Sequence, residues 1–94
     1  MKEIKIWNFV INDKSPTFII AEVSANHWWN IENAKKIIKA AADSWADAIK
    51  LQTYTADTMT IDCKNDDFMI NSWTQWDGKY LYDLYWDAFT PWEW

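Results

Sequence analysis

The sequence predicts a small α/β fold that contains a βαβ unit with parallel strands. Two strand-like apolar runs, TFIIAEVS at 17–24 and ADAIKLQTY at 46–54, flank a stretch with helical periodicity. The first run is apolar almost throughout, which favours a strand buried on both faces of a parallel sheet. A strand, a helix and a second strand in this order form a βαβ unit, and its crossover is expected to be right-handed.

The opening segment is predicted to be hairpin-like. Residues 3–11 (EIKIWNFVI) have β-like composition, and NDKSP at 12–16 is a turn signal that leads to the strand at 17–24. The chain of 94 residues is long enough for one small domain. We therefore expect an opening hairpin segment over 1–16, and the first βαβ unit with the loop and helix that follow it over 17–94.

The helix between the two strands has a clear start and a continuous apolar face. Asn30 is a favourable N-cap residue. The apolar positions recur at helical spacing, and they are Ala34, Ile37, Ile38, Ala41, Ala42 and Trp45.

Beyond residue 54 the sequence pattern is less regular. TADTMTIDCKNDD is expected to be a polar loop, DFMIN a helical turn, and KYLYDLYWDAF at 79–89 a helix. Thr90 and Pro91 are placed as the N-cap and first residue of another helix.

Composition excludes several classes of partner. The net charge of −5 disfavours nucleic acid and anionic membranes. Cys63 is the single cysteine, which indicates a reduced thiol in a cytoplasmic protein rather than a disulfide or a cysteine metal cluster. No apolar run reaches the ~18 residues of a membrane helix, and MKEIKIW is too charged for a signal peptide.

Charged residues occur where both strands would otherwise be apolar. Because alternate strand residues share a face, Glu22 and Ser24 lie on one face of the first strand, and Lys50 and Gln52 on one face of the second. Glu22 and Lys50 could form a structural ion pair, which gives little net stability when buried. We favour a polar site, because ligands bind at the carboxyl ends of strands in parallel α/β sheets.

His27 is ambiguous from the residues alone. A single histidine after a strand is more often a hydrogen-bonded loop residue than a ligand. The chain has no second histidine, so a histidine metal site is not expected.

Five sequence blocks resemble the sialic acid synthase family, and within it most closely the pseudaminic acid synthase branch. The blocks are FIIAEVSANH, NAKKIIKAAADS, ADAIKLQTYT, WDGKYLYDLY and TPWEW. Each block alone is a weak signal, but together they are specific and span nearly the whole chain.

The resemblance implies a transferase that condenses phosphoenolpyruvate with an amino-hexose. The products would be a nine-carbon, sialic-acid-like sugar acid of the pseudaminic acid type and phosphate. Members of this family have a (β/α)₈ barrel, use a divalent metal (Mn or Mg) and can form homodimers. A barrel needs ~250 residues, so we expect this chain to be an N-terminal part of one, inactive in isolation and without the metal ligands.

The resemblance also implies roles for five residues. Lys50 would contact phosphoenolpyruvate, and Glu22 (as the catalytic residue) and Gln52 would lie in the sugar and reaction region. Asn26 and His27 would bind substrate from the first strand-to-helix loop, at the mouth of the barrel.

Tryptophan is unusually frequent and glycine unusually rare. The chain has 9 tryptophans and 1 glycine, whereas glycine ordinarily makes up about 7% of residues. Six tryptophans fall where family motifs or local geometry favour glycine: Trp7, Trp28, Trp29, Trp45, Trp73 and Trp86. We interpret these six as occupants of glycine positions, and Trp76, Trp92 and Trp94 as family-like tryptophans.

Two other readings remain open at this stage. Exposed indole rings can stack on sugars, so the chain could be a tryptophan-rich carbohydrate-binding module without catalysis. It could also be a segment that neither catalyses a reaction nor binds carbohydrate. The synthase reading is favoured because it accounts for the sequence blocks and for the shared face of Glu22, Lys50 and Gln52.

Overall fold

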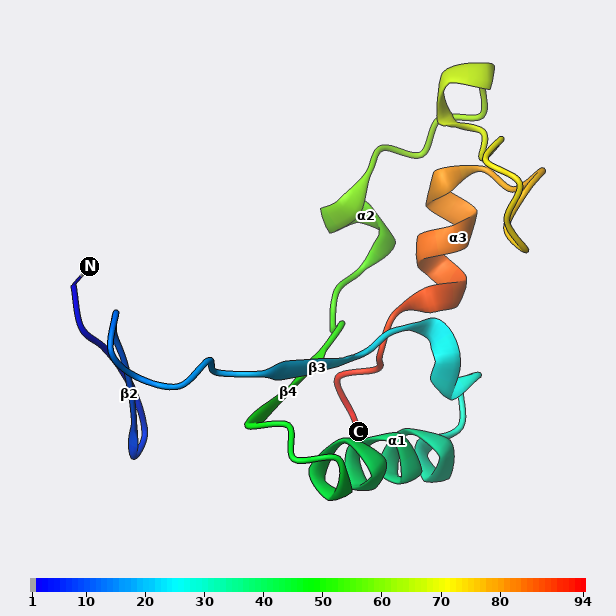
Figure 1. The fold of residues 1–94 in the computed structure, drawn as a ribbon. Helices are drawn as coiled ribbons and strands as arrows, with labels where there is room; N and C mark the ends of the chain where they lie inside the picture. The colour runs from blue at the N-terminus through cyan, green and yellow to red at the C-terminus, as the bar shows by residue number, and fades with distance from the viewer. Residues whose placement is uncertain (1) are drawn as a thin grey trace.

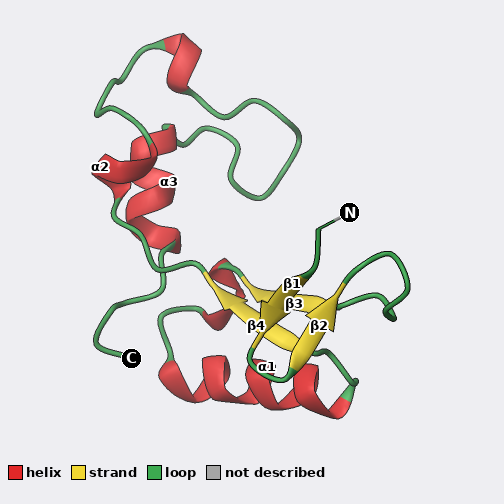
Figure 2. Cartoon of the chain, turned by 90° about the vertical axis from the view of Figure 1, so that its left-hand side faces the viewer, coloured by secondary structure: helices red, strands yellow, loops and turns green. Residues whose placement is uncertain are grey.

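A computed structural model describes residues 2–94 as a mixed α/β chain with two small sheets (Figures 1 and 2). The strands are β1 (Ile4–Ile6), β2 (Phe9–Ile11), β3 (Ile20–Val23) and β4 (Ala48–Leu51). The helices are α1 (Ile31–Asp43), α2 (Ala56–Met59) and α3 (Leu81–Ala88), with short 3-10 helices η1 (Ala25–His27) and η2 (Asp66–Phe68).

The predicted βαβ unit is confirmed. β3 and β4 pair in parallel, with Glu22 opposite Lys50 and Val23 opposite Leu51. Helix α1 connects them and lies along one face of the pair (Figure 1). Leu51 shares a hollow with Ile31 and Ala34 of α1, so Leu51 faces the helix. Because neighbouring strand residues point to opposite faces, Lys50 and Glu22 lie on the face away from α1.

The predicted opening hairpin closes at a different place. β1 and β2 pair antiparallel with Ile6 opposite Phe9, so the turn is Trp7–Asn8 and lies inside the run 3–11. The prediction that 12–16 turns this run back onto the strand at 17–24 was wrong. The Asn12 carboxamide instead accepts hydrogen bonds from Lys14 and Ser15, and the chain then runs extended into β3 (Figure 1).

Helix α1 begins and ends with recognisable caps. The Asn30 side chain accepts from the backbone N–H groups of Glu32 and Asn33, as an N-cap should. At the other end, the Trp45 N–H donates to Ala42 and the Ala46 N–H donates to Ala41. This is the Schellman pattern, which requires a left-handed residue at the position of Trp45.

The segment after residue 54 is more helical than the sequence indicated. The prediction of a loop over 55–67 missed α2, a single turn started by a capping box between Thr55 and Thr58. The predicted helical turn at DFMIN corresponds to η2, and the helix predicted over 79–89 corresponds to α3. No helix follows Thr90 within the described residues, where the chain ends in a turn.

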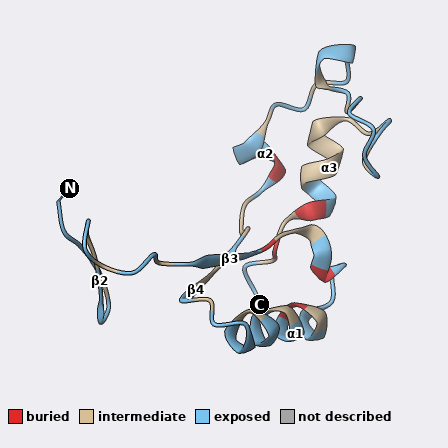
Figure 3. Cartoon of the chain, in the orientation of Figure 1, coloured by how far each residue is buried: buried red, intermediate tan, exposed pale blue. Residues whose placement is uncertain are grey.

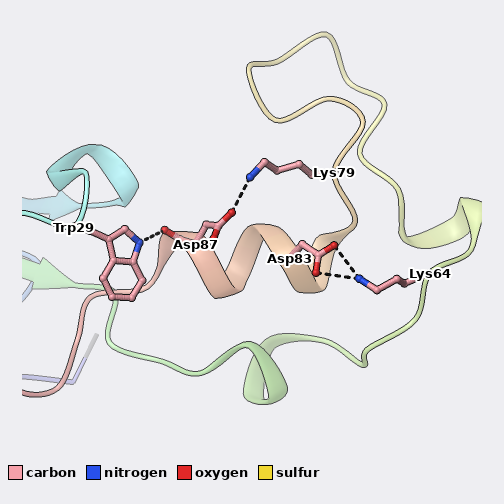
Figure 4. Close-up of polar contacts among 5 residues, drawn as sticks. All are labelled: Trp29, Lys64, Lys79, Asp83 and Asp87. Carbon is pink, nitrogen blue, oxygen red and sulfur yellow. Dashed lines mark hydrogen bonds and ion pairs between the residues drawn. The ribbon is translucent and has the colours of Figure 1, made fainter.

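Ion pairs tie the long connection between α2 and α3 to helix α3. Lys64 pairs with Asp83 at 2.9 Å and Lys79 pairs with Asp87 at 2.7 Å (Figure 4). Trp29 reaches the end of the same helix, where its Nε1–H donates to the backbone carbonyl of Asp87 at 2.6 Å. All of these side chains are substantially exposed, so each ion pair adds little stability.

The core is small and the molecule is open (Figure 3). The buried residues among 2–94 are Val23, Ala34, Ala56, Ala88, His27 and Thr90. Burial of the first strand on both faces was therefore a wrong prediction for this chain, since Ile20 and Glu22 are exposed. The radius of gyration is 16.9 Å, against about 12 Å for a compact domain of this length.

Five tryptophans have left-handed backbone. Positive φ among non-glycine residues of 2–94 occurs at Trp7, Trp28, Trp29, Trp45 and Trp73. The interpretation of Trp86 as a glycine position was wrong, because Trp86 lies inside α3 with no positive φ. In the described part of the chain, no helix is both long and apolar enough to cross a membrane.

Candidate functional site

Glu22, Lys50 and Gln52 form a polar cluster at the carboxyl ends of β3 and β4. The Lys50 Nζ lies 3.2 Å from the Glu22 Oε2, and the Gln52 amide nitrogen donates to the Glu22 Oε1. The parallel register produces this arrangement, since it sets Glu22 directly across from Lys50. The structure thus brings together the three residues that strand alternation placed on one face.

The cluster keeps the Glu22 carboxyl ionised. The hydrogen bond from Gln52 lowers the pKa of Glu22, the hydrogen bond from Lys50 lowers it further, and partial desolvation opposes both. The side chains remain open to solvent, with Lys50 61% and Glu22 40% exposed. An exposed ion pair of this kind contributes little to the stability of the fold. A role in binding or reaction is therefore a better explanation of the cluster than a structural role.

Ser24 also belongs to the cluster. The Gln52 amide nitrogen lies 3.2 Å from the Ser24 hydroxyl oxygen, so one amide group contacts both Glu22 and Ser24. The alternation of strand residues had set Ser24 on the face of Glu22, and that signal was sufficient to include it. Ser24 was nevertheless not among the predicted site residues.

Asn26 shapes the loop that follows β3. Its side-chain oxygen accepts a hydrogen bond from the Ser24 N–H at 3.1 Å. The Asn26 side chain therefore folds back on the strand end, and holds the first turn of η1 next to the cluster.

His27 is completely buried, and both of its ring nitrogens have partners within the chain. The Nδ1 accepts from the Trp29 N–H at 3.0 Å, and the Nε2 lies 3.3 Å from the Thr90 hydroxyl. The Trp94 ring packs edge-on at 5.0 Å. Burial lowers the pKa of His27, so the ring is neutral at pH 7.

Thr90 is a buried polar residue that sequence reasoning did not assign to the site. Its N–H donates to the Gln52 carbonyl at 2.8 Å, and its hydroxyl meets His27. The local sequence signal was misleading, because Thr followed by Pro is typical of a helix N-terminus.

The described residues do not fit a metal centre. Nowhere in 2–94 do three or more His, Cys, Asp or Glu side chains come together as a set that could hold an ion. Cys63 is a free, half-buried thiol.

The cluster can bind an anion and orient a hydroxyl group. The Lys50 ammonium is a mobile positive charge that suits a phosphate or carboxylate. The ionised Glu22 accepts hydrogen bonds from hydroxyl groups, and the Gln52 amide can both donate and accept. The side chains of Lys50, Glu22 and Gln52 therefore suit small ligands that carry negative charge and hydroxyl groups better than an apolar ligand.

The rival reading of a tryptophan platform has no support in the geometry. Trp7, Trp45 and Trp73 lie in the β1–β2 turn, after α1 and in the connection before α3. The aromatic contacts of tryptophan within 2–94 join Trp29 and Trp86 to Phe89, and Trp94 to His27, and no two indole rings stack.

Residues 37–94 match the model of the NeuB family. The chain is 50% identical over 91 residues to a pseudaminic acid synthase of Campylobacter jejuni, a match that covers 97% of this chain and 26% of that protein. It is 48% identical over 79 residues to the pseudaminic acid synthase of Helicobacter pylori, covering 84% of this chain and 23% of the relative. The chain therefore spans about a quarter of the length of these curated relatives.

Proposed function

The chain belongs to the NeuB family, and we propose on that basis that it forms the opening part of a synthase that condenses phosphoenolpyruvate with an amino-hexose. The product would be a nine-carbon sugar acid of the pseudaminic acid type, with release of phosphate. The proposal is supported by relatives called pseudaminic acid synthase that match nearly all of the chain.

One structural observation carries the proposal to this chain's own residues. The parallel register sets Lys50 opposite Glu22, with Gln52 bonded to the same carboxylate, at the carboxyl ends of two adjacent strands. This edge is where parallel α/β folds bind their ligands. A purely structural ion pair would not need the third polar group.

Each residue has a defined role in the proposed reaction. Lys50 binds the negative charge of phosphoenolpyruvate. Glu22 is the catalytic carboxylate, which stays ionised and accepts a hydrogen bond from a hydroxyl group in the reacting region, while Gln52 fixes the direction of that carboxylate. The new carbon–carbon bond joins the methylene carbon of phosphoenolpyruvate to the carbonyl carbon of the sugar, whose oxygen takes up a proton. A water molecule adds to C2 of the former phosphoenolpyruvate, and the C2–O bond to the phosphate breaks, so that phosphate leaves.

The wider architecture belongs to the same proposal. Residues 17–94 would supply the first βαβ unit and the following loop and helix of a (β/α)₈ barrel, and residues 1–16 a preceding hairpin segment. Asn26 would contact substrate from the first loop at the barrel mouth, and His27, predicted there with it, would support that loop from within, because it is buried and both ring nitrogens are bonded. A divalent metal (Mn or Mg), homodimer formation and a cytoplasmic location complete it, and the metal ligands would come from outside residues 2–94.

A chimera tests the proposal directly. Residues 2–94 replace the matching segment of the Campylobacter jejuni synthase, once with the present tryptophans and once with glycine at the five positive-φ positions. We expect the glycine form to release phosphate when phosphoenolpyruvate, the amino-hexose and manganese are all present. Failure of that form to turn over would contradict the proposal.

Variants of the cluster and a control lysine variant distinguish a role in the reaction from a general effect of lost charge. In the active chimera, Glu22→Gln and Lys50→Met should each reduce turnover at least ~100-fold, as expected for groups that act in the reaction. Lys39→Met removes an exposed lysine that pairs only with Asp43 on α1, and should leave turnover unchanged. Equal turnover of all variants would show that the cluster is not the site.

A further inference from the structure

Thr90 joins two parts of the candidate site that are far apart in sequence. It is only 2% exposed, and it uses two different groups. Its backbone N–H donates to the carbonyl of Gln52 at 2.8 Å, and its hydroxyl lies 3.3 Å from the His27 Nε2. Thr90 therefore links the residue just after β4 to the loop just after β3.

The direction of the His27–Thr90 hydrogen bond follows from the other side of the ring. The Nδ1 accepts from the Trp29 N–H at 3.0 Å, so the hydrogen of the neutral imidazole lies on Nε2. The Nε2–H then donates to the Thr90 hydroxyl oxygen. Removal of that hydroxyl would leave a buried ring N–H without an acceptor, which is a costly arrangement.

Gln52 depends on this link because it lies outside the β3–β4 ladder. It follows Leu51, the last residue of β4, and its backbone carbonyl accepts from Thr90. Its side chain points the other way and donates to Glu22 and Ser24. A shift of the segment around Thr90 would therefore move Gln52 relative to the carboxylate.

We propose that Thr90 is a positioning residue of the candidate site, which holds Gln52 against Glu22 through its backbone and is itself held in place by the neutral ring of His27. That the cluster binds substrate rests on the proposed function, whereas the link from His27 through Thr90 to Gln52 does not depend on it. Thr90 acts through Gln52 and does not touch the substrate.

Nuclear magnetic resonance on the whole chain tests this with two replacements of one residue. Thr90→Val keeps the shape and removes the hydroxyl, whereas Thr90→Ser keeps the hydroxyl. We expect the measured pKa of Glu22 to rise toward the ordinary carboxyl value in Thr90→Val, because Gln52 drifts away, and to stay low in Thr90→Ser. An unchanged Glu22 titration in Thr90→Val would overturn the proposal.

A control and an independent measurement keep the test decisive. Thr17→Val removes the hydroxyl of an exposed threonine that precedes β3, and should leave the Glu22 titration unchanged. In the unsubstituted chain, nitrogen chemical shifts should show the His27 hydrogen on Nε2, and a hydrogen on Nδ1 would overturn the proposal without any variant. Binding of phosphoenolpyruvate is measured separately, by following the resonances of Lys50 as the ligand is added. Absence of binding would count against the proposed function and not against the role of Thr90.

A second inference rests on a different observation, the backbone of the tryptophans. All five non-glycine residues with positive φ in 2–94 are tryptophan, although this backbone suits glycine and disfavours large side chains. Three of them barely touch the rest of the molecule, since Trp7, Trp45 and Trp73 are 88%, 87% and 96% exposed. No packing gain offsets the backbone cost at these three.

We infer that the codon at these five positions is one that the source cell decodes as glycine. The codon UGA differs from the glycine codon GGA in its first base, and different genetic codes read UGA as stop, tryptophan or glycine. On this inference the fold obtains glycine at the five left-handed positions now written as tryptophan, and Trp76, Trp92 and Trp94 would be encoded by UGG.

Peptide sequencing by mass spectrometry tests the inference on protein isolated from the source cell. Peptides that contain positions 28, 29 and 45 should have the mass of glycine at each, and the peptide with Trp92 and Trp94 should have the mass of tryptophan. The gene should carry UGA at the first set and UGG at the second. UGG codons with tryptophan masses at positions 28, 29 and 45 would overturn it.

Discussion

Trp45 shows at the residue scale how backbone and side chain can disagree. Its φ of 65° is what the Schellman end of α1 needs. Its side chain is 87% exposed, although its spacing in the sequence fits the apolar stripe of the helix. The end of the helix therefore follows the backbone hydrogen bonds, and the indole is left in solvent.

Replacement of Trp45 by glycine should stabilise the folded chain. A left-handed residue that is not glycine costs roughly 1–2 kcal/mol, and the exposed ring returns little of that, so we expect a gain of about 1 kcal/mol in the free energy of unfolding. Urea denaturation measures it, and Trp45→Ala, which keeps a Cβ, is the control and should gain much less. Equal or lower stability for the glycine form would mean that Trp45 is a packed native residue.

Trp29 should respond differently to the same replacement. Its backbone is also left-handed, with φ of 56°, but its indole donates to the Asp87 carbonyl and packs edge-on against Phe89 at 4.7 Å (Figure 4). A hydrogen bond of this kind is worth about 0.5–1.5 kcal/mol, which offsets the backbone relief. Trp29→Gly should therefore gain clearly less than Trp45→Gly in the same urea experiment, and a larger gain would refute this view of the contact.

His27 should make stability depend on pH near neutrality. Burial lowers its pKa in the folded chain below the unfolded value of about 6.5, so the unfolded state takes up the proton first. The stabilisation is complete above the unfolded pKa and is lost as the pH falls from there through the lowered folded pKa. Urea denaturation should show lower stability at pH 5.5 than at pH 7.5.

Two variants identify His27 as the source of that dependence. His27→Gln should remove most of the difference between the two pH values. Glu22→Gln should keep it, because the lowered pKa of Glu22 acts only at more acidic pH. A difference that persists in His27→Gln would assign the pH dependence to other groups.

At the scale of secondary structure, helix α1 is the element with the best-defined boundaries. Asn30 caps two backbone N–H groups at its start. Loss of such a cap costs about 1 kcal/mol, so Asn30→Ala should lower the free energy of unfolding by that amount in urea. Asn30→Asp keeps the accepting oxygen, so its free energy of unfolding should be close to that of the unsubstituted chain. A similar loss of stability in Asn30→Ala and Asn30→Asp would argue against capping as the cause.

The elements predicted correctly are those whose signals are local. The alternation of Glu22 with its neighbours and of Lys50 with its neighbours placed both on one face, because a strand has a period of two residues.

The β1–β2 turn was missed because Trp7 occupies the place where a hairpin usually shows glycine. Helix α2 was missed because four residues are too few for an apolar period. Thr90 was missed because its partner His27 lies 63 residues away, and no sequence spacing indicates that pairing.

At the scale of the whole molecule, the chain exposes more surface than a compact protein would. Its accessible surface is 7379 Å², whereas a compact monomer of 11.2 kDa exposes about 5,700 Å². Figure 3 shows the few buried positions near α1, η1 and the ends of α2 and α3. A core this small supports only a marginally stable fold.

The chain alone should lack synthase activity. Residues 2–94 contain two parallel strands and no set of metal ligands, whereas a complete barrel has eight strands. A phosphate-release assay with phosphoenolpyruvate, the amino-hexose and manganese should therefore match a control without protein. Turnover well above that control would show that these residues are sufficient for the reaction.

The β3–β4 pair has a consequence for self-association. Each of its strands has one edge without a neighbouring strand in the described chain, and such edges act as templates for pairing with other chains. The short apolar segments IAEV and AIKL would favour stacking in register, but each carries one charge, Glu22 or Lys50. In a parallel stack of identical strands, like charges would lie directly above one another and repel. The charges of the candidate site thus also act as gatekeepers against aggregation.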